Sequence, residues 1–97
     1  MARFDVYRTD AGLVLDVQTD LLYGLTTRLV APLVPMNGGP LPAGRLNPIL
    51  DVLGELYALH PQLMAAMPER LLTKPVDNLK RHHDRIASAL DMIFLGF

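Results

Sequence analysis

The hydrophobic pattern of this chain changes period about two-thirds of the way along its 97 residues. Up to that point, apolar and polar residues alternate over short stretches, which is the pattern of half-buried β-strands. Later, Leu79, Ile86 and Ile93 recur every seven residues, which fits one face of a helix. The sequence therefore predicts a mainly antiparallel β-fold over about residues 1–74, closed by one C-terminal helix over about residues 76–95.

The first strands form a predicted hairpin. Phe4 and Val6 alternate with polar neighbours, and residues 9–12, Thr-Asp-Ala-Gly, have the composition of a tight turn. Beyond the turn, a second alternating stretch runs from Leu13 to Val17. We therefore expect two antiparallel strands joined by a short turn near the start of the chain.

The next part of the chain combines one strand with one irregular segment. A strand is expected at about residues 28–34, and Pro32 within it lacks a backbone N–H, which is typical of an edge strand or a bulge. The stretch 35–48 is rich in proline and glycine and predicts a long loop. Such a loop is either an idle surface connection or a functional segment.

A second hairpin completes most of the expected β part. Residues 49–53 and 56–60 flank Gly54-Glu55, which has the composition of a two-residue turn with glycine in its first central position. Residues 63–67 could extend the sheet further.

The predicted helix has recognisable ends. A second series at seven-residue spacing, His83, Leu90 and Phe97, widens its apolar face. Pro75 stands just before the helix, and Gly96 stands where it is expected to stop. Because His83 belongs to the apolar stripe, we expect it to be a packed or interfacial histidine.

Length and composition set the size of the fold. Ninety-seven residues predict a single domain over residues 1–97, since a second core needs about 100 more residues. Apolar residues make up 51% of the chain and charged residues only 20%. This balance favours self-association or a protein partner, although a well-packed monomer is the alternative.

Charge and segment hydropathy exclude several classes of partner. Nine Lys and Arg against ten Asp and Glu give a formal net charge of −1, which argues against direct binding of nucleic acid by this chain. There is no cysteine, no apolar run of the ~20 residues that span a membrane, and no signal-peptide pattern at the start. We therefore expect a cytoplasmic protein with no membrane partner.

Candidate catalytic and metal-binding residues are few. His82 and His83 are adjacent and diverge by about 100° on a helix, so they do not form the usual pair of metal ligands. Ser88 is the only serine and has no evident base at helical spacing, and the hydroxyls of Thr26 and Thr27 fit turn capping. No metal, no cofactor and no enzymatic activity are expected.

The end of the chain is its most unusual segment. Met92 to Phe97 are six uncharged residues, Met-Ile-Phe-Leu-Gly-Phe. Two interpretations remain open at this point. The side chains dock on the protein's own core or on a second protomer, or they form an exposed plug whose aromatic anchors bind another protein.

Four segments along the chain form an ordered set. They are Asp16-Val17-Gln18-Thr19-Asp20-Leu21-Leu22, Arg28-Leu29-Val30-Ala31-Pro32-Leu33, Leu63-Met64-Ala65-Ala66-Met67-Pro68 and Asp91-Met92-Ile93-Phe94-Leu95-Gly96-Phe97. This ordered set resembles the CcdB family of toxins. The resemblance covers nearly the whole chain and is poorest in the middle loop.

The resemblance implies a fold, a target and a regulator. CcdB-like proteins are homodimers with an SH3-like β-barrel and a C-terminal helix, a fold shared with the MazF toxins. Their dimer binds the gyrase A component of DNA gyrase and traps the covalent gyrase–cleaved DNA complex, without making or breaking a bond itself. A CcdA-like antitoxin neutralises the toxin, and together they repress their own operon, so that the toxin meets DNA only indirectly.

The same resemblance implies a set of gyrase-binding residues. The family's best-known toxin has Trp at the position of Leu95, and Phe97 replaces a smaller aliphatic residue. An indole can stack on an arginine of the target, which leucine cannot do. The residues carried over by position are Thr19, Leu21, Leu22, Asp91, Phe94, Leu95, Gly96 and Phe97.

Two other functions remain as alternatives. A MazF-like endoribonuclease on the same fold would need an arginine beside a hydroxyl, and Arg28 with Thr26 or Thr27 is the candidate cluster. An inactive relative would still bind the antitoxin but leave gyrase untouched.

Overall fold

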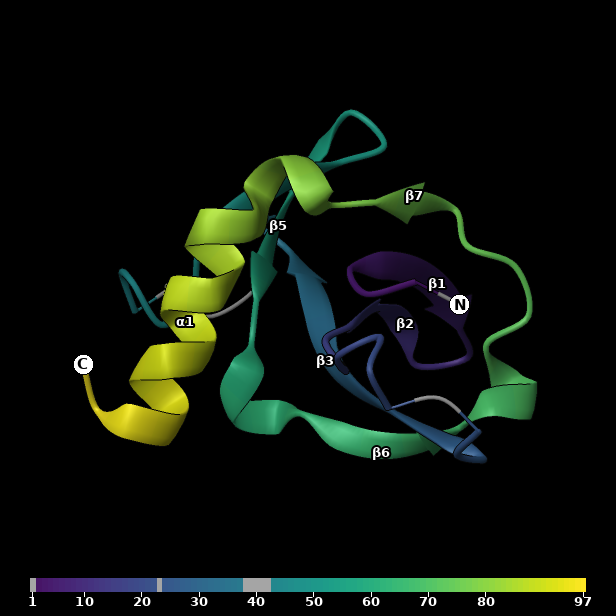
Figure 1. The fold of residues 1–97 in the computed structure, drawn as a ribbon. Coiled ribbons are helices and arrows are strands. Elements are labelled where there is room, and N and C mark those ends of the chain that lie inside the picture. The colour runs from purple at the N-terminus through teal and green to yellow at the C-terminus, as the bar shows by residue number, and fades with distance from the viewer. Residues whose placement is uncertain (1, 23, 38–42) are drawn as a thin grey trace.

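The computed structural model describes residues 2–22, 24–37 and 43–97. Within these described residues, seven strands, three short 3-10 helices and one α-helix follow one another (Figure 1). In chain order they are β1 (Asp5–Thr9), β2 (Gly12–Asp16), β3 (Thr27–Pro35), β4 (Ile49–Val52), β5 (Glu55–Leu59), η1 (Pro61–Leu63), β6 (Ala65–Pro68), η2 (Glu69–Leu71), β7 (Asp77–Asn78), η3 (Lys80–His82) and α1 (His83–Leu95).

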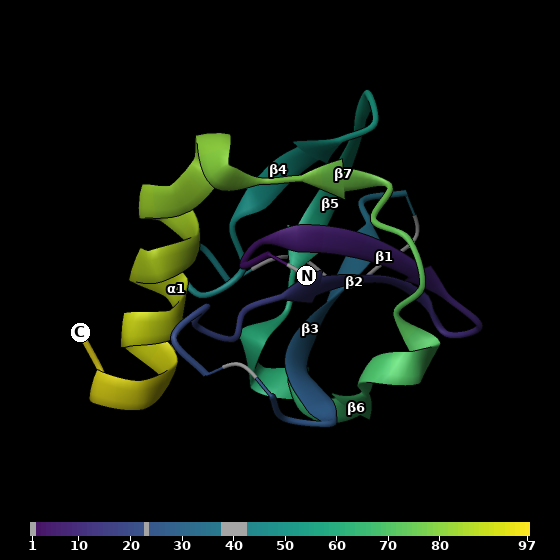
Figure 2. The same ribbon diagram turned by 45° about the vertical axis from the view of Figure 1, so that its right-hand side comes forward.

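The strands form one antiparallel sheet that curls into a nearly closed barrel (Figures 1 and 2). Its order is β4-β5-β3-β2-β1-β7, with β6 pairing separately with β3. The expected first hairpin is confirmed, with Val6 opposite Leu15 and Thr9 opposite Gly12. The mainly antiparallel β-fold with one C-terminal helix is therefore the observed architecture.

The long strand β3 is a central strand of the sheet. Pro32 was expected on an edge strand or at a bulge, and the structure places it in this central strand rather than on an edge. Residues 27–30 of β3 pair with β6, and residues 33–35 pair with β5, while β2 lies along the other side. Pro32 falls between the two partner strands, where its carbonyl accepts a hydrogen bond from the amide of His60 (3.0 Å). A central strand tolerates proline here because the neighbouring strand changes at this residue.

Side chains bridge the seam between the terminal strands of the sheet, β4 and β7. The guanidinium of Arg81 lies 3.2 Å from the Asp77 carboxylate and donates to the carbonyl of Asp51 (2.9 Å). His82 Nε2 lies 2.6 Å from Asp51 Oδ1, and the Leu53 amide donates to Asp77 (3.3 Å). Hydrogen bonds from His82 and Arg81 hold the pKa values of Asp51 and Asp77, respectively, below their usual range. These contacts connect the sheet edges at the point where α1 begins.

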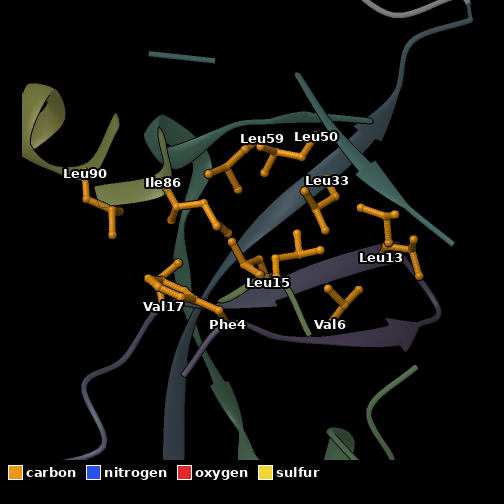
Figure 3. Close-up of a cluster of buried hydrophobic side chains, with 13 residues drawn as sticks. Phe4, Val6, Leu13, Leu15, Val17, Leu33, Leu50, Leu59, Ile86 and Leu90 are labelled. Carbon is orange, nitrogen blue, oxygen red and sulfur yellow. The ribbon is translucent and has the colours of Figure 1, made fainter. Parts of the chain in front are cut away.

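The main core lies inside the barrel and extends to α1. Figure 3 shows Ile86 and Leu90 reaching from the helix towards Leu59 and the side chains of β1 and β2. The fully or almost fully buried members of this cluster are Phe4, Val6, Leu13, Leu15, Val17, Ala31, Leu33, Leu50, Val52, Leu59, Leu79, Ile86 and Leu90. The helix therefore covers one side of the barrel with its first half.

The α-helix begins later than the predicted residue 76. The Val76 amide donates to the carbonyl of Val6 (2.8 Å), and the Leu79 amide donates to that of Phe4 (2.9 Å). These bonds hold the segment as strand β7 beside β1, so the sheet also extends past the predicted limit at residue 74. Leu79 is buried as the seven-residue spacing predicts, although it precedes the α-helix.

The turn of the second hairpin is one residue earlier than expected. Val52 pairs with Glu55, so the turn residues are Leu53 and Gly54 rather than Gly54 and Glu55. Both have positive φ, 52° and 83°, as the favoured type I′ hairpin turn requires. Leucine is uncommon in this left-handed region. The sequence-based prediction put Gly54 at the first turn position because it included Leu53 in the preceding strand.

The remaining expectations for the strands are mostly confirmed. The strand expected at 28–34 is β3, and of the predicted extension 63–67 only residues 65–67 lie in β6, since Leu63 ends the 3-10 helix η1. The centre of the predicted loop 35–48, residues 38–42, lies outside the described residues. No helix in the described part of the chain has the length and apolar character that crossing a membrane demands.

Candidate functional site

The residues at the end of the chain form an exposed apolar tail, which we define as residues 92–97. Phe94, Leu95 and Phe97 are 65%, 60% and 75% exposed, and Met92 and Ile93 are partly exposed as well. The tail does not fold back onto the barrel. It is the larger of two apolar surfaces that include the sequence-predicted site residues.

Gly96 determines how the tail leaves the helix. α1 ends at Leu95, and Gly96 follows with φ of 80° and ψ of 9°. Its amide donates to the carbonyl of Met92 (3.1 Å), which closes the last turn. Only glycine adopts this left-handed conformation without steric cost. The predicted helix stop at Gly96 is therefore confirmed.

The early loop between β2 and β3 is the second apolar surface. Leu21 is 84% exposed, and Leu22 is about half exposed. Thr19 orders this loop, because its hydroxyl accepts from the Leu21 amide (3.3 Å) and its carbonyl accepts from the Leu22 amide (3.2 Å). The Gln18 side chain also donates to the Leu22 carbonyl (3.1 Å). Thr19 thus acts within the turn, and the two leucines face outward.

The early loop and the tail are each connected to the main core, the loop through the residue before it and the tail through α1. Val17, which precedes the loop, packs in the cluster that contains Ile86 and Leu90 of α1 (Figure 3). No hydrogen bond joins Thr19, Leu21 or Leu22 to residues 91–97 among the described residues. The structure therefore presents the predicted residues as two exposed surfaces, not as one pocket.

A buried ion pair fixes the base of the early loop. Arg28 donates to Asp16 through Nε (2.8 Å) and Nη2 (2.7 Å), and both side chains are almost completely buried. Burial raises the pKa of Asp16, while the contacts from Arg28 and the Gln18 amide oppose that rise. Because the Arg28 guanidinium is committed to Asp16, it is not presented to solvent beside Thr26 and Thr27. The proposed ribonuclease cluster is therefore not assembled in this structure.

A second buried polar group lies beside this pair on β1. The Tyr7 hydroxyl lies 3.4 Å from Asp5 Oδ2, and Asn78 of β7 donates to Asp5 Oδ1 (2.9 Å). Burial, reinforced by the nearby carboxylates, raises the pKa of Tyr7 to about 12. This phenol therefore stays protonated at neutral pH and contacts Asp5 within β1, while the Asn78–Asp5 hydrogen bond joins β1 to β7.

The three histidines occupy separate environments. His82 faces Asp51 across the seam, whereas His83 contacts Phe4 edge-on (ring centroids 5.6 Å apart) with more than half of its side chain exposed. His60 is buried, and its Nε2 has no hydrogen-bond partner in the part of the chain that the structure describes. Within the described ranges, no three His, Asp or Glu side chains are grouped as metal ligands would be.

Some exposed apolar residues were missed by sequence reasoning. Leu25 of the early loop is about half exposed. Met92 and Ile93, already part of the predicted tail, are exposed rather than covered by the protein's own core. The sequence signal that could have identified Leu25 is the presence of an apolar residue in an otherwise polar turn.

Comparison with known proteins assigns the family. A model of the family described as CcdB protein matches residues 3–96. A comparison with curated proteins gives no match. The family model spans the barrel, the early loop and α1 up to Gly96, in agreement with the mostly β architecture and its single C-terminal helix. The chain therefore belongs to the CcdB family, the toxins of toxin–antitoxin systems.

Proposed function

We propose that this protein is a non-enzymatic toxin that poisons bacterial DNA gyrase by inserting its apolar tail into gyrase A. The observation that carries the proposal is the exposure of Phe94, Leu95 and Phe97 beyond the part of α1 that covers the core. Contiguous exposed apolar side chains usually mark an interaction site. Burying a fully exposed side chain of this kind contributes about 1.5–3 kcal/mol, and these three, already partly covered, contribute correspondingly less.

The proposed contact surface has two parts. Leu95, Gly96 and Phe97 form its centre, with Phe94 and Asp91 about one helical turn back. Thr19, Leu21 and Leu22 form the second part on the early loop. A few aromatic anchors surrounded by weaker contacts are the usual composition of a binding hot spot.

We further propose that the toxin acts as a homodimer in the cytoplasm, where gyrase works. Two-fold symmetry presents two copies of the tail to a target that is itself two-fold. The dimer binds the gyrase state that holds cleaved DNA better than the other states, and this difference in affinity raises the population of that state. No bond in gyrase or DNA is made by the toxin in this mechanism.

The regulator in this proposal is a CcdA-like antitoxin that competes with gyrase and forms a repressor of the operon together with the toxin. Direct DNA contact then belongs to the antitoxin. The near-neutral net charge of this chain supports that division, because phosphate contacts depend on basic residues. The burial of Arg28 against Asp16 weighs against the ribonuclease alternative.

A DNA cleavage assay tests the proposal. Purified gyrase, supercoiled DNA and ATP are incubated with the wild-type protein or with a variant that lacks residues 95–97. We expect the wild type to produce linear DNA after detergent and protease treatment, and the truncated variant to produce none while remaining folded. Leu71→Ser, at a half-exposed leucine in η2, is the matched control and should retain activity.

Other outcomes separate the alternatives. Continued supercoiling without linear DNA in the presence of wild-type protein would contradict gyrase poisoning and favour the inactive relative. Cleavage of protein-free RNA by the wild type would favour the ribonuclease. Unfolding of the truncated variant would show that residues 95–97 are structural.

A further inference from the structure

A hollow on the surface lies between the loop that precedes β4 and the first half of α1. Its volume is about 330 Å³, and it is lined by Arg45, Asp84, Arg85 and Ser88. None of these residues belongs to the tail or to the early loop. Neither the family match nor the proposed function assigns a role to this hollow.

The position of Arg45 is fixed by its own loop. The Ala43 amide donates to Asn47 Oδ1 (3.0 Å), and the Leu46 amide donates to the carbonyl of Ala43 (3.1 Å), so residues 43–47 form a closed turn. Asn47 is buried, and its Nδ2 donates to the Leu59 carbonyl (3.1 Å). Arg45 therefore extends from a turn that is attached to the barrel.

Ser88 orients the guanidinium of Arg45 on the helix. Arg45 Nε donates a hydrogen bond to Ser88 Oγ. A guanidinium has five N–H groups, so the four on its terminal nitrogens are left for other acceptors. The Ser88 hydroxyl accepts the Arg45 hydrogen bond and keeps its own hydrogen to donate.

Arg85 supplies the second positive charge. It lies three residues before Ser88 on α1, so the two side chains share one helix face. Neither Arg45 nor Arg85 takes part in an ion pair among the described residues, unlike Arg28 and Arg81. Two guanidiniums and one hydroxyl donor thus converge on one hollow.

We propose that this hollow binds a phosphoryl group, as inorganic phosphate or as the phosphate of a small phosphomonoester. Planar guanidinium groups match the spacing of phosphate oxygens and form charge-assisted hydrogen bonds with them. A tetrahedral dianion accepts from both arginines and from the Ser88 hydroxyl at once. The inference stands apart from the gyrase proposal and does not depend on it.

Asp84 limits the affinity of the site. Its carboxylate also lines the hollow, and its Oδ1 lies 3.2 Å from His83 Nδ1. The carboxylate repels a bound anion, although its full exposure to solvent screens this repulsion. We therefore expect a dissociation constant in the millimolar range and a preference for doubly charged ligands.

The test is a titration of inorganic phosphate followed by NMR of the arginine Nε–H groups, with chloride used to keep the ionic strength constant. We expect saturable shifts for Arg45 and Arg85. Arg85→Gln should weaken binding by more than about tenfold, because it removes a charge-assisted hydrogen bond. Arg8→Gln, at an exposed arginine of β1, is the matched control and should bind as the wild type does.

Two more variants sharpen the result. Asp84→Asn should tighten phosphate binding by up to about fivefold, since it removes a like charge at a solvated site. Ser88→Ala tests the alternative in which the Arg45–Ser88 bond only fastens the loop to α1. A loss of thermal stability in this variant, without saturable phosphate binding by the wild type, would overturn the proposal.

A second titration identifies the source of the phosphoryl group. A nucleoside 5′-monophosphate is compared with the same nucleoside without phosphate. Equal binding of the monophosphate and inorganic phosphate assigns the site to the phosphoryl group alone, and tighter binding of the monophosphate assigns it to the phosphomonoester. Absence of a saturable shift with either ligand, or equal loss in Arg8→Gln and Arg85→Gln, would contradict the site.

Discussion

The two halves of α1 are both rich in apolar residues, but their surroundings are opposite. In the first half, Ile86, Ala89 and Leu90 are buried against the barrel. In the second half, every residue from Asp91 to Leu95 is exposed, as are Gly96 and Phe97 after the helix. The barrel provides a partner surface for the first half only. The difference shows that an apolar helical stripe identifies a contact surface without showing whether its partner is internal or external.

The charge distribution along the helix follows the same division. Asp84 and Arg85 lie in the first half, whereas Asp91 is the only charged side chain from Ile86 to Phe97. An exposed surface without function is usually rich in charged residues. The second half, in which Asp91 is the only charged side chain, therefore matches a surface that is covered when the protein acts.

Of the substitutions proposed here, Ile86→Ala should have the largest effect, and it acts on the stability of the fold. Ile86 is completely buried, so its truncation leaves a cavity in the core and lowers the free energy of unfolding by about 2–5 kcal/mol. Urea unfolding followed by circular dichroism measures the change. A loss below about 1 kcal/mol would mean that the first half of α1 is not the part that holds the helix on the barrel.

Leu95→Trp tests the exposed second half of α1. Its side chain is exposed, so we expect no large change in stability, but an indole adds apolar area and can stack on an arginine of gyrase. The concentration needed for DNA cleavage should fall by about tenfold, which corresponds to about 1.4 kcal/mol of binding energy. Equal or lower potency would contradict a tail-centred contact of this kind.

Asp77→Asn tests the salt bridge between Asp77 and Arg81 just before the helix. Because Arg81 holds the pKa of Asp77 below its ordinary value of about 3.9, the ionised pair stabilises the fold above about pH 4 and loses that contribution as the pH falls further. We expect the variant to lose up to about 1 kcal/mol at pH 7, since Arg81 is partly exposed, and little near pH 2. Thermal unfolding across this pH range measures it, with Asp10→Asn, on an exposed turn, as the control. A pH-independent difference would exclude the ionised pair as its cause.

Phe94→Gln should have the smallest effect on folding. Phe94 is largely exposed, and glutamine has a good helix propensity, so the free energy of unfolding should change by less than about 0.5 kcal/mol. The same urea experiment as for Ile86→Ala gives a direct comparison of the two helix halves. Destabilisation as large as that of Ile86→Ala would show that the tail packs on the protein itself.

Much of the β part was predictable from local patterns. Alternation around Phe4 and Val6, with turn residues after them, predicts the first hairpin because each side of a strand faces one environment. The predictions were wrong where the conformation of a segment depends on a tertiary partner. Pro32 is placed in a central strand by the change from β6 to β5 beside it, and residues 77–78 are held as a strand by β1.

The candidate site was likewise predictable only in the parts that depend on local sequence features. The uncharged tail and Gly96 are local features, and so is the turn chemistry of Thr19. In contrast, the pairing of Arg28 with Asp16 and of Arg45 with Ser88 joins residues that are 12 and 43 positions apart. No spacing rule reveals such contacts, because they depend on how the strands and the helix are brought together.

The sequence by itself therefore determined the order of strands and helix, the helix stop at Gly96 and the presence of an unusually apolar end. Periodicity and turn chemistry are properties of neighbouring residues, and a single chain displays them directly. Only the tertiary structure decided which apolar residues become core and which stay exposed. That choice depends on whether another element lies opposite them, as the barrel does for Ile86 and does not for Phe97.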